Sequence, residues 1–112
     1  MSTRGPARRF FELLHSPLMK KTPPQAARRW FVQGRVQGVG FRWFVVRCAR
    51  EVGVTGWVRN EADGGVQAFA VGTPEQLDQL AGRLHKGPML AEVRTVEQNE
   101  ANPERHTSFE IR

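Results

Sequence analysis

The sequence has few of the residues that build disulfides, metal sites or membrane spans. Its 112 residues include one cysteine, Cys48, so no intrachain disulfide can form. The three histidines are widely separated and C-x-x-C is absent, so no spacing typical of a zinc site is visible. No apolar run approaches the length that crosses a bilayer. We therefore expect a single-domain, reduced, cytoplasmic globular protein with no recognisable zinc-site spacing and no membrane partner.

Negative charge is scarce at the start of the chain. The formal net charge is +6, and residues 1–27 hold five basic residues against one acidic residue, a net +4 that leaves +2 for residues 28–112. The first segment is also rich in proline and lacks a sustained hydrophobic period. We expect residues 1–27 to form a disordered basic extension and residues 28–112 to form the domain. A basic arm can bind nucleic acid or membrane surfaces without sequence preference.

Two other interpretations of residues 1–27 stay open. Arginine-rich, acid-poor starts also occur in organelle transit peptides. Alternatively, Met19 is the natural first residue and the preceding 18 residues are not part of the protein. A signal peptide does not fit, because no apolar core follows Met1 or Met19.

From Trp30 onward the hydrophobic pattern becomes regular. Residues 30–36 alternate as in a strand, and a glycine-rich loop follows at 37–40. Apolar residues then recur at helical spacing over 41–52, and Gly53 is well placed to end that helix. Further strands are predicted at 54–60, 66–71, 91–97 and 107–112, with a second helix that has Thr73 as N-cap and stops at Gly87.

This order predicts an α+β fold, the ferredoxin-like split β-α-β sandwich. It would have an antiparallel sheet of four or five strands with both helices on one face. The first two strands would run parallel, with the third between them. The loop at 37–41 and Asn60 would then lie at the same edge of the sheet, roughly 10 Å apart by two interstrand spacings.

The loop at 37–41 suits an anion. Gly38 and Gly40 leave room for close backbone approach, and successive amides can point inward as a nest. The helix that begins near Phe41 adds free N–H groups and the positive end of a dipole. Arg42 lies in its first turn, where its guanidinium can fold back over the loop. Glycine-containing strand-to-helix loops also occur as ordinary turns, so this pattern alone does not define a function.

Two longer motifs make the pattern specific. The first is Val32-Gln33-Gly34-Arg35-Val36-Gln37-Gly38-Val39-Gly40-Phe41-Arg42, and the second is Gly56-Trp57-Val58-Arg59-Asn60, followed by Gly64, Val66 and Gly72. Both resemble the signatures of the acylphosphatase family, over about Trp30 to Arg112. Members of that family often carry one more tyrosine after the arginine that matches Arg112, and this sequence does not.

The resemblance implies a metal-free and cofactor-free hydrolase that splits acyl phosphates into a carboxylate and inorganic phosphate. By the matching positions, Arg42 would bind the phosphoryl group and Asn60 would hold the attacking water. The phosphoryl oxygens would be bound by the amides of Gln37, Gly38, Val39, Gly40 and Phe41. Inorganic phosphate would be both product and competitive ligand, and we expect a monomer without a specific nucleic-acid partner.

Two alternative functions are compatible with parts of the sequence. Ferredoxin-like sheets bind RNA through aromatic residues on the open face, but the third strand offers only Phe69. The second alternative is an accessory domain that handles phosphate or carbamoyl phosphate, because resembling domains occur at the start of larger hydrogenase-maturation proteins. We expect a free-standing enzyme instead, since the sequence stops at Arg112. The physiological substrate stays open among acetyl phosphate, 1,3-bisphosphoglycerate and carbamoyl phosphate, which share the reacting group.

Overall fold

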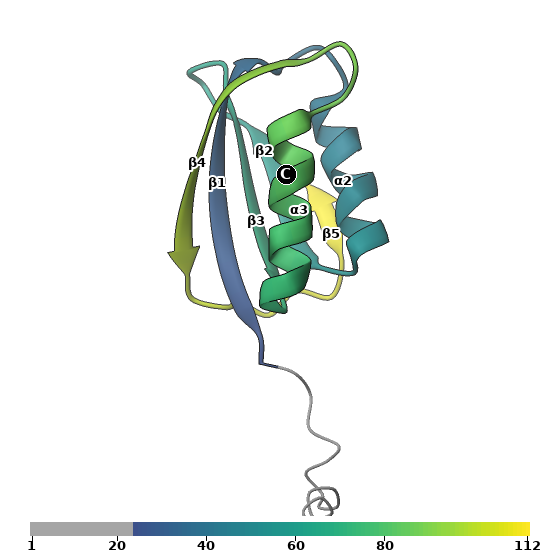
Figure 1. The fold of residues 1–112 in the computed structure, drawn as a ribbon, viewed down its shortest axis with the longest axis vertical. Helices are drawn as coiled ribbons and strands as arrows, with labels where there is room; N and C mark the ends of the chain where they lie inside the picture. The colour runs from purple at the N-terminus through teal and green to yellow at the C-terminus, as the bar shows by residue number, and fades with distance from the viewer. Residues whose placement is uncertain (1–23) are drawn as a thin grey trace, which may run out of the picture.

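The computed structural model describes residues 24–112 as a five-stranded sheet with two helices on one face (Figure 1). Positions 1–23, most of the predicted basic extension, lie outside the described residues. The elements in chain order are β1 (Ala26–Arg35), α2 (Phe41–Val52), β2 (Thr55–Asn60), β3 (Val66–Gly72), α3 (Pro74–Lys86), β4 (Glu92–Ala101) and β5 (Phe109–Ile111). Neither of these two helices is long and apolar enough to cross a membrane.

The strands lie in the order β4-β1-β3-β2-β5. Both β1 and β2 pair antiparallel with β3, so β1 and β2 run parallel to each other. The predicted ferredoxin-like α+β fold is therefore confirmed. The sheet is mixed rather than purely antiparallel, because β5 pairs parallel with β2. The segment after β4 crosses below the sheet in Figure 1, so that β5 starts from the same end as β2.

Two strands are longer than predicted. β1 begins at Ala26 instead of Trp30, and β4 continues to Ala101 instead of ending near residue 97. The two extra lengths pair with each other, with Ala27 opposite Ala101. Charged residues conceal this extension in the sequence, because a buried-and-exposed alternation is hard to recognise where arginine and glutamate occupy a strand. Here Arg28 contacts both Asp78 at 2.8 Å and Glu100 at 3.4 Å.

The main core lies between the sheet and the helices. Its largest members are fully buried: Trp30, Val32, Phe41, Val45, Phe109, Leu77, Leu80 and Leu84. Burial of each large apolar side chain stabilises the fold by about 1.5–3 kcal/mol. The indole nitrogen of Trp30 donates to Oε1 of Gln98 at 2.7 Å, so this polar atom is satisfied. At the start of α3, the predicted cap is present, since Thr73 Oγ1 accepts a hydrogen bond from the backbone N–H of Gln76 at 3.2 Å.

The opposite face of the sheet is covered by arginine side chains. Trp57 and Phe69 lie side by side there, with ring centroids 5.8 Å apart. The guanidinium of Arg29 lies over Phe69 at 5.3 Å, and that of Arg112 lies over Trp57 at 4.7 Å. His106 packs against Phe69 as well, and the two large aromatic rings are almost completely buried. They are therefore not free to stack with bases, as the nucleic-acid alternative would require.

Two glycines, Gly56 in β2 and Gly82 in α3, allow a test of how closely other atoms pack around them. A Cβ on Gly56, where φ is +143°, would lie 1.9 Å from the carbonyl oxygen of Phe69. We expect Gly56→Ala to lower the free energy of unfolding by about 3 kcal/mol or more, since backbone must move.

Gly82 in α3 has open space around it. There we expect Gly82→Ala to raise the stability by about 0.5–1 kcal/mol.

Urea denaturation of both variants measures these changes. Equal stability of Gly56→Ala and the unmodified protein would contradict the close contact between β2 and β3.

Candidate active site

The loop between β1 and α2 has two glycines in the left-handed conformation. Gly38 has a φ of +75° and Gly40 a φ of +79°. A Cβ at either position would meet no atom within 4 Å. Glycine is thus required here by the backbone conformation and not by crowding from other protein atoms. The open space also leaves the loop amides accessible to a ligand.

The N-terminus of α2 is left without a side-chain cap. Gly40 is the N-cap residue and makes no side-chain hydrogen bond, and the first turn contains no acidic residue. The first N–H groups of a helix lack partners inside the helix, and they lie at the positive end of its dipole. This terminus can therefore accept an anion from outside.

Asn60 is the last residue of β2 and is exposed at the end of the strand. It pairs with Val66 on β3, which is buried in the core beneath the helices. Val58, two residues earlier on β2, lies in the same core. Because side chains alternate along a strand, Asn60 projects toward the helix-covered face, on the side where α2 begins.

Gln37 joins the loop to the other half of the site. Its side-chain amide Nε2 donates to the carbonyl oxygens of Glu61 and Gly65, both at 2.8 Å. Glu61 directly follows Asn60, so this side chain connects the loop after β1 with the hairpin after β2. The sequence predicted a role only for the main-chain amide of Gln37. The sequence feature that could have indicated the side-chain contacts is a glutamine at the end of one strand, opposite a glycine-rich hairpin.

The hairpin has its own network around Asp63. The Asp63 carboxylate accepts from the Gly65 amide at 2.9 Å and from Nε2 of Gln33 at 3.0 Å. These donors hold the pKa of Asp63 below its ordinary value of 3.8, and the backbone amide of Gly65 has the largest effect. Together with the Gln37 contacts, they fix the hairpin against the end of β1.

Arg42 lies in the first turn of α2 and is half-buried. Three other arginines, Arg28, Arg59 and Arg83, each contact a carboxylate at 2.6–2.9 Å. Within residues 24–112, no acidic side chain forms an ion pair with Arg42, which is also true of several exposed arginines such as Arg35 and Arg47. A guanidinium that is neither neutralised nor deeply buried is free to bind a phosphate oxygen pair.

Comparison with known proteins identifies the family. The acylphosphatase family model matches residues 28–111. The chain belongs to the acylphosphatase family. An acylphosphatase of Solibacter usitatus is 51% identical over 89 residues, which cover 80% of this chain and 93% of that protein.

Solved structures agree with this assignment. An acylphosphatase from Coxiella burnetii matches with a TM-score of 0.76 and 35% identity, covering 79% of this chain and 93% of that one. The HypF structure from T. kodakarensis matches with a TM-score of 0.69 and 35% identity, over 78% of this chain and 12% of the HypF chain. The acylphosphatase fold thus also occurs as a small part of a longer protein.

The acylphosphatase motifs of this chain meet at one edge of the sheet. The loop of the first motif and Asn60 of the second are joined there through the Gln37 contact with Glu61. Arg59 of the second motif is directed elsewhere, since it contacts Glu61 at 2.9 Å and lies over Trp57 on the opposite face. Within the described range, no three histidine, cysteine, aspartate or glutamate residues gather as a metal site would require.

The Gln37 contacts predict a positioning role. Gln37→Ala removes two hydrogen bonds, and we expect it to lower the unfolding free energy by about 1–3 kcal/mol. We also expect kcat to fall at least about tenfold, because the loop and Asn60 lose their common support. Gln33→Ala is the matched control, since it removes one exposed hydrogen bond from the same hairpin. A Gln37→Ala variant with unchanged stability and kcat would contradict this role.

The Asp63 network predicts a pH dependence. A lowered folded-state pKa means that the contribution of this carboxylate to stability is present above pH 3.8 and is lost as the pH falls through the lowered value. We expect an NMR titration of Asp63 to give a midpoint below 3.8, which Gln33→Ala raises. A midpoint at or above 3.8 in the unmodified protein would rule out the network.

Proposed function

We propose that this chain hydrolyses acyl phosphates to a carboxylate and inorganic phosphate, by direct attack of a water that Asn60 holds. The activity follows from its membership of the acylphosphatase family. The observation that best supports the residue assignment is the uncapped N-terminus of α2, which two left-handed glycines precede and the unpaired Arg42 follows.

The phosphoryl group would bind at the start of α2. Amides of Gln37 to Phe41 would donate to its oxygens, and the positive end of the helix dipole would favour its negative charge. Arg42 would contact two phosphoryl oxygens at once, which its planar fork allows. Phosphoryl transfer passes through a loose transition state with charge on these oxygens, so positioning and charge stabilisation are the main requirements.

Asn60 would orient the water. Its side-chain carbonyl can accept a hydrogen bond from the water while its amide donates one, although an amide is not a base. No strong base or acid is required, because the carboxylate of an acyl phosphate is already a good leaving group. The Gln37 contacts would keep Asn60 at a fixed distance from the loop.

Inorganic phosphate would bind the same amides and Arg42, as product and as competitive inhibitor. We further propose that the enzyme acts without a metal or organic cofactor, as a monomer in the cytoplasm, without a specific nucleic-acid partner. Light scattering that gives a mass near 12.7 kDa would support the monomer, and twice this mass would exclude it.

Hydrolysis of benzoyl phosphate in excess EDTA tests the residue roles. We expect Arg42→Ala and Asn60→Ala each to lower kcat about 10²–10³-fold, by comparison with the loss of one oxyanion donor. Arg42→Lys should also lose at least about tenfold, because a lysine keeps the charge but not the two-pronged geometry.

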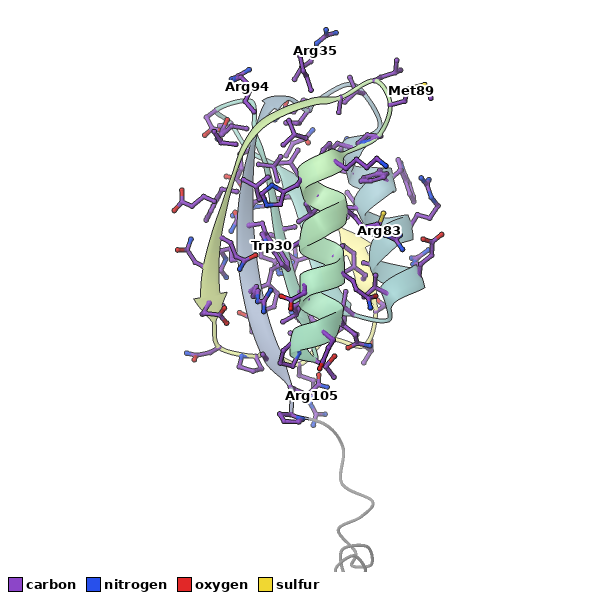
Figure 2. The ribbon with its side chains drawn as sticks, viewed as in Figure 1. Trp30, Arg35, Arg83, Met89, Arg94 and Arg105 are labelled. Atoms are coloured by element: carbon purple, nitrogen blue, oxygen red, sulfur yellow. The ribbon has the colours of Figure 1, made fainter. Side chains whose placement is uncertain are left out.

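Arg105→Ala is the matched control, because Arg105 lies at the opposite end of the sheet from the α2 N-terminus (Figure 2). It should keep full activity. Turnover by folded Arg42→Lys at the unmodified rate would refute the bidentate contact.

A further inference from the structure

A groove lies directly beside Arg42, between α2 and the edge strand β5. It has a volume of about 440 Å³. Its apolar walls come from Trp43 and Val46 on α2 and from Phe109 and Ile111 on β5. We call this depression the α2–β5 groove. Arg42 lines its end, so one side chain borders both the groove and the proposed phosphate site.

Trp43 is exposed without a structural reason in the described fold. It is 67% exposed, whereas Phe41, Val45 and Cys48 of the same helix are buried. The helix turns Trp43 away from the core, so its ring does not stabilise the packing. A single exposed apolar side chain is common on protein surfaces, but Trp43 borders an apolar depression, and aromatic side chains that line such depressions are typical of ligand-binding sites.

The groove opens at the same edge of the sheet as the proposed site. β5 runs parallel to β2, with Ile111 opposite Val58. The amide of Arg112 donates to the carbonyl of Val58 at 2.8 Å, so β5 ends two residues before Asn60. The apolar wall at Ile111 and the position of Asn60 are therefore at the same end of the neighbouring strands.

Apart from Arg42, which would hold the phosphoryl group, the charges at the groove do not favour an ionic occupant. Arg50 and Glu110 both border it and have opposite signs. The Arg50 guanidinium is also directed to the carbonyl oxygen of Phe109, at 3.4 Å. The surface that is left to contact a ligand is therefore mainly apolar. It adjoins Arg42, the cation that would hold the phosphoryl group.

We propose that the α2–β5 groove binds the acyl group of the substrate and favours acyl phosphates with aromatic or longer aliphatic acyl groups over acetyl phosphate. This inference rests on the proposed function. In an acyl phosphate a single bridging oxygen separates the phosphorus from the acyl carbon. In a direct displacement the acyl oxygen leaves on the side of the phosphorus opposite the water at Asn60. With the phosphoryl group bound to Arg42, the acyl chain would then lie beside the neighbours of Arg42 on α2, of which Trp43 is exposed and Phe41 is buried.

The test compares kcat/KM for benzoyl phosphate and acetyl phosphate. In the unmodified protein we expect benzoyl phosphate to be the better substrate, and hexanoyl phosphate to lie closer to benzoyl than to acetyl phosphate. Trp43→Ala should lower kcat/KM for benzoyl phosphate about tenfold, mainly through KM, the scale of apolar pocket contacts. For acetyl phosphate it should change less than about twofold, because a methyl group reaches little of the ring.

Met89→Ala is the matched control. Met89 is 94% exposed in the turn between α3 and β4, and its side chain points outward from the molecule (Figure 2). It does not line the groove. We expect this variant to keep both values of kcat/KM, which separates a specific effect of Trp43 from a general effect of losing an exposed apolar side chain.

The inhibition constants of phenylphosphonate and methylphosphonate give a second readout that does not depend on turnover. Phenylphosphonate should bind more tightly, and Trp43→Ala should remove most of this difference. If Trp43→Ala leaves the benzoyl-to-acetyl ratio unchanged while both substrates are hydrolysed, the groove inference is wrong and the proposed function stands. If the unmodified protein hydrolyses neither substrate, the proposed function and the inference both fail.

Discussion

The position of β3 between β1 and β2 is the constraint on which the remaining structure depends. β3 is buried along its whole length and pairs antiparallel on both sides. This forces β1 and β2 to run in one direction, so that the chain leaves both strands at the same edge of the sheet. The glycine-rich loop and Asn60 meet there although they are far apart in the sequence. The side chain of Gln37 then bridges the gap that β3 leaves between the two strand ends.

The sequence predicted the elements well where hydrophobic periodicity and caps agree. The helix at 41–52 was predicted with its bounds, and Thr73 is the N-cap that its spacing with Gln76 indicated. The direction of β5 could not be read in the same way, because a three-residue strand has too little pattern to reveal its partner. The length of β4 was missed for a similar reason, since most of its residues are polar and exposed.

For the site, sequence patterns identified residues but not their contacts. The two motifs placed Arg42 and the loop glycines on the correct elements, and the topology put Asn60 at the same edge. The double contact of Gln37 with two hairpin carbonyls depends on the shape of a turn that lies 24 to 28 residues further along the chain. The apolar wall beside Arg42 likewise comes from β5, whose position depends on its parallel pairing with β2.

If the amides at the start of α2 bind the phosphoryl group as proposed, Gly40 brings stability and function into competition at one position. A serine or aspartate N-cap would stabilise α2 by a few tenths of a kcal/mol relative to glycine, but such a cap takes an extended conformation, whereas Gly40 has a φ of +79°. A capping side chain would also occupy the same amides that an anion needs. Selection for heat resistance cannot therefore use the commonest way of strengthening a helix at this place. Thermal adaptation of such an enzyme has to act elsewhere, for example on α3 or on the exposed residues of β4.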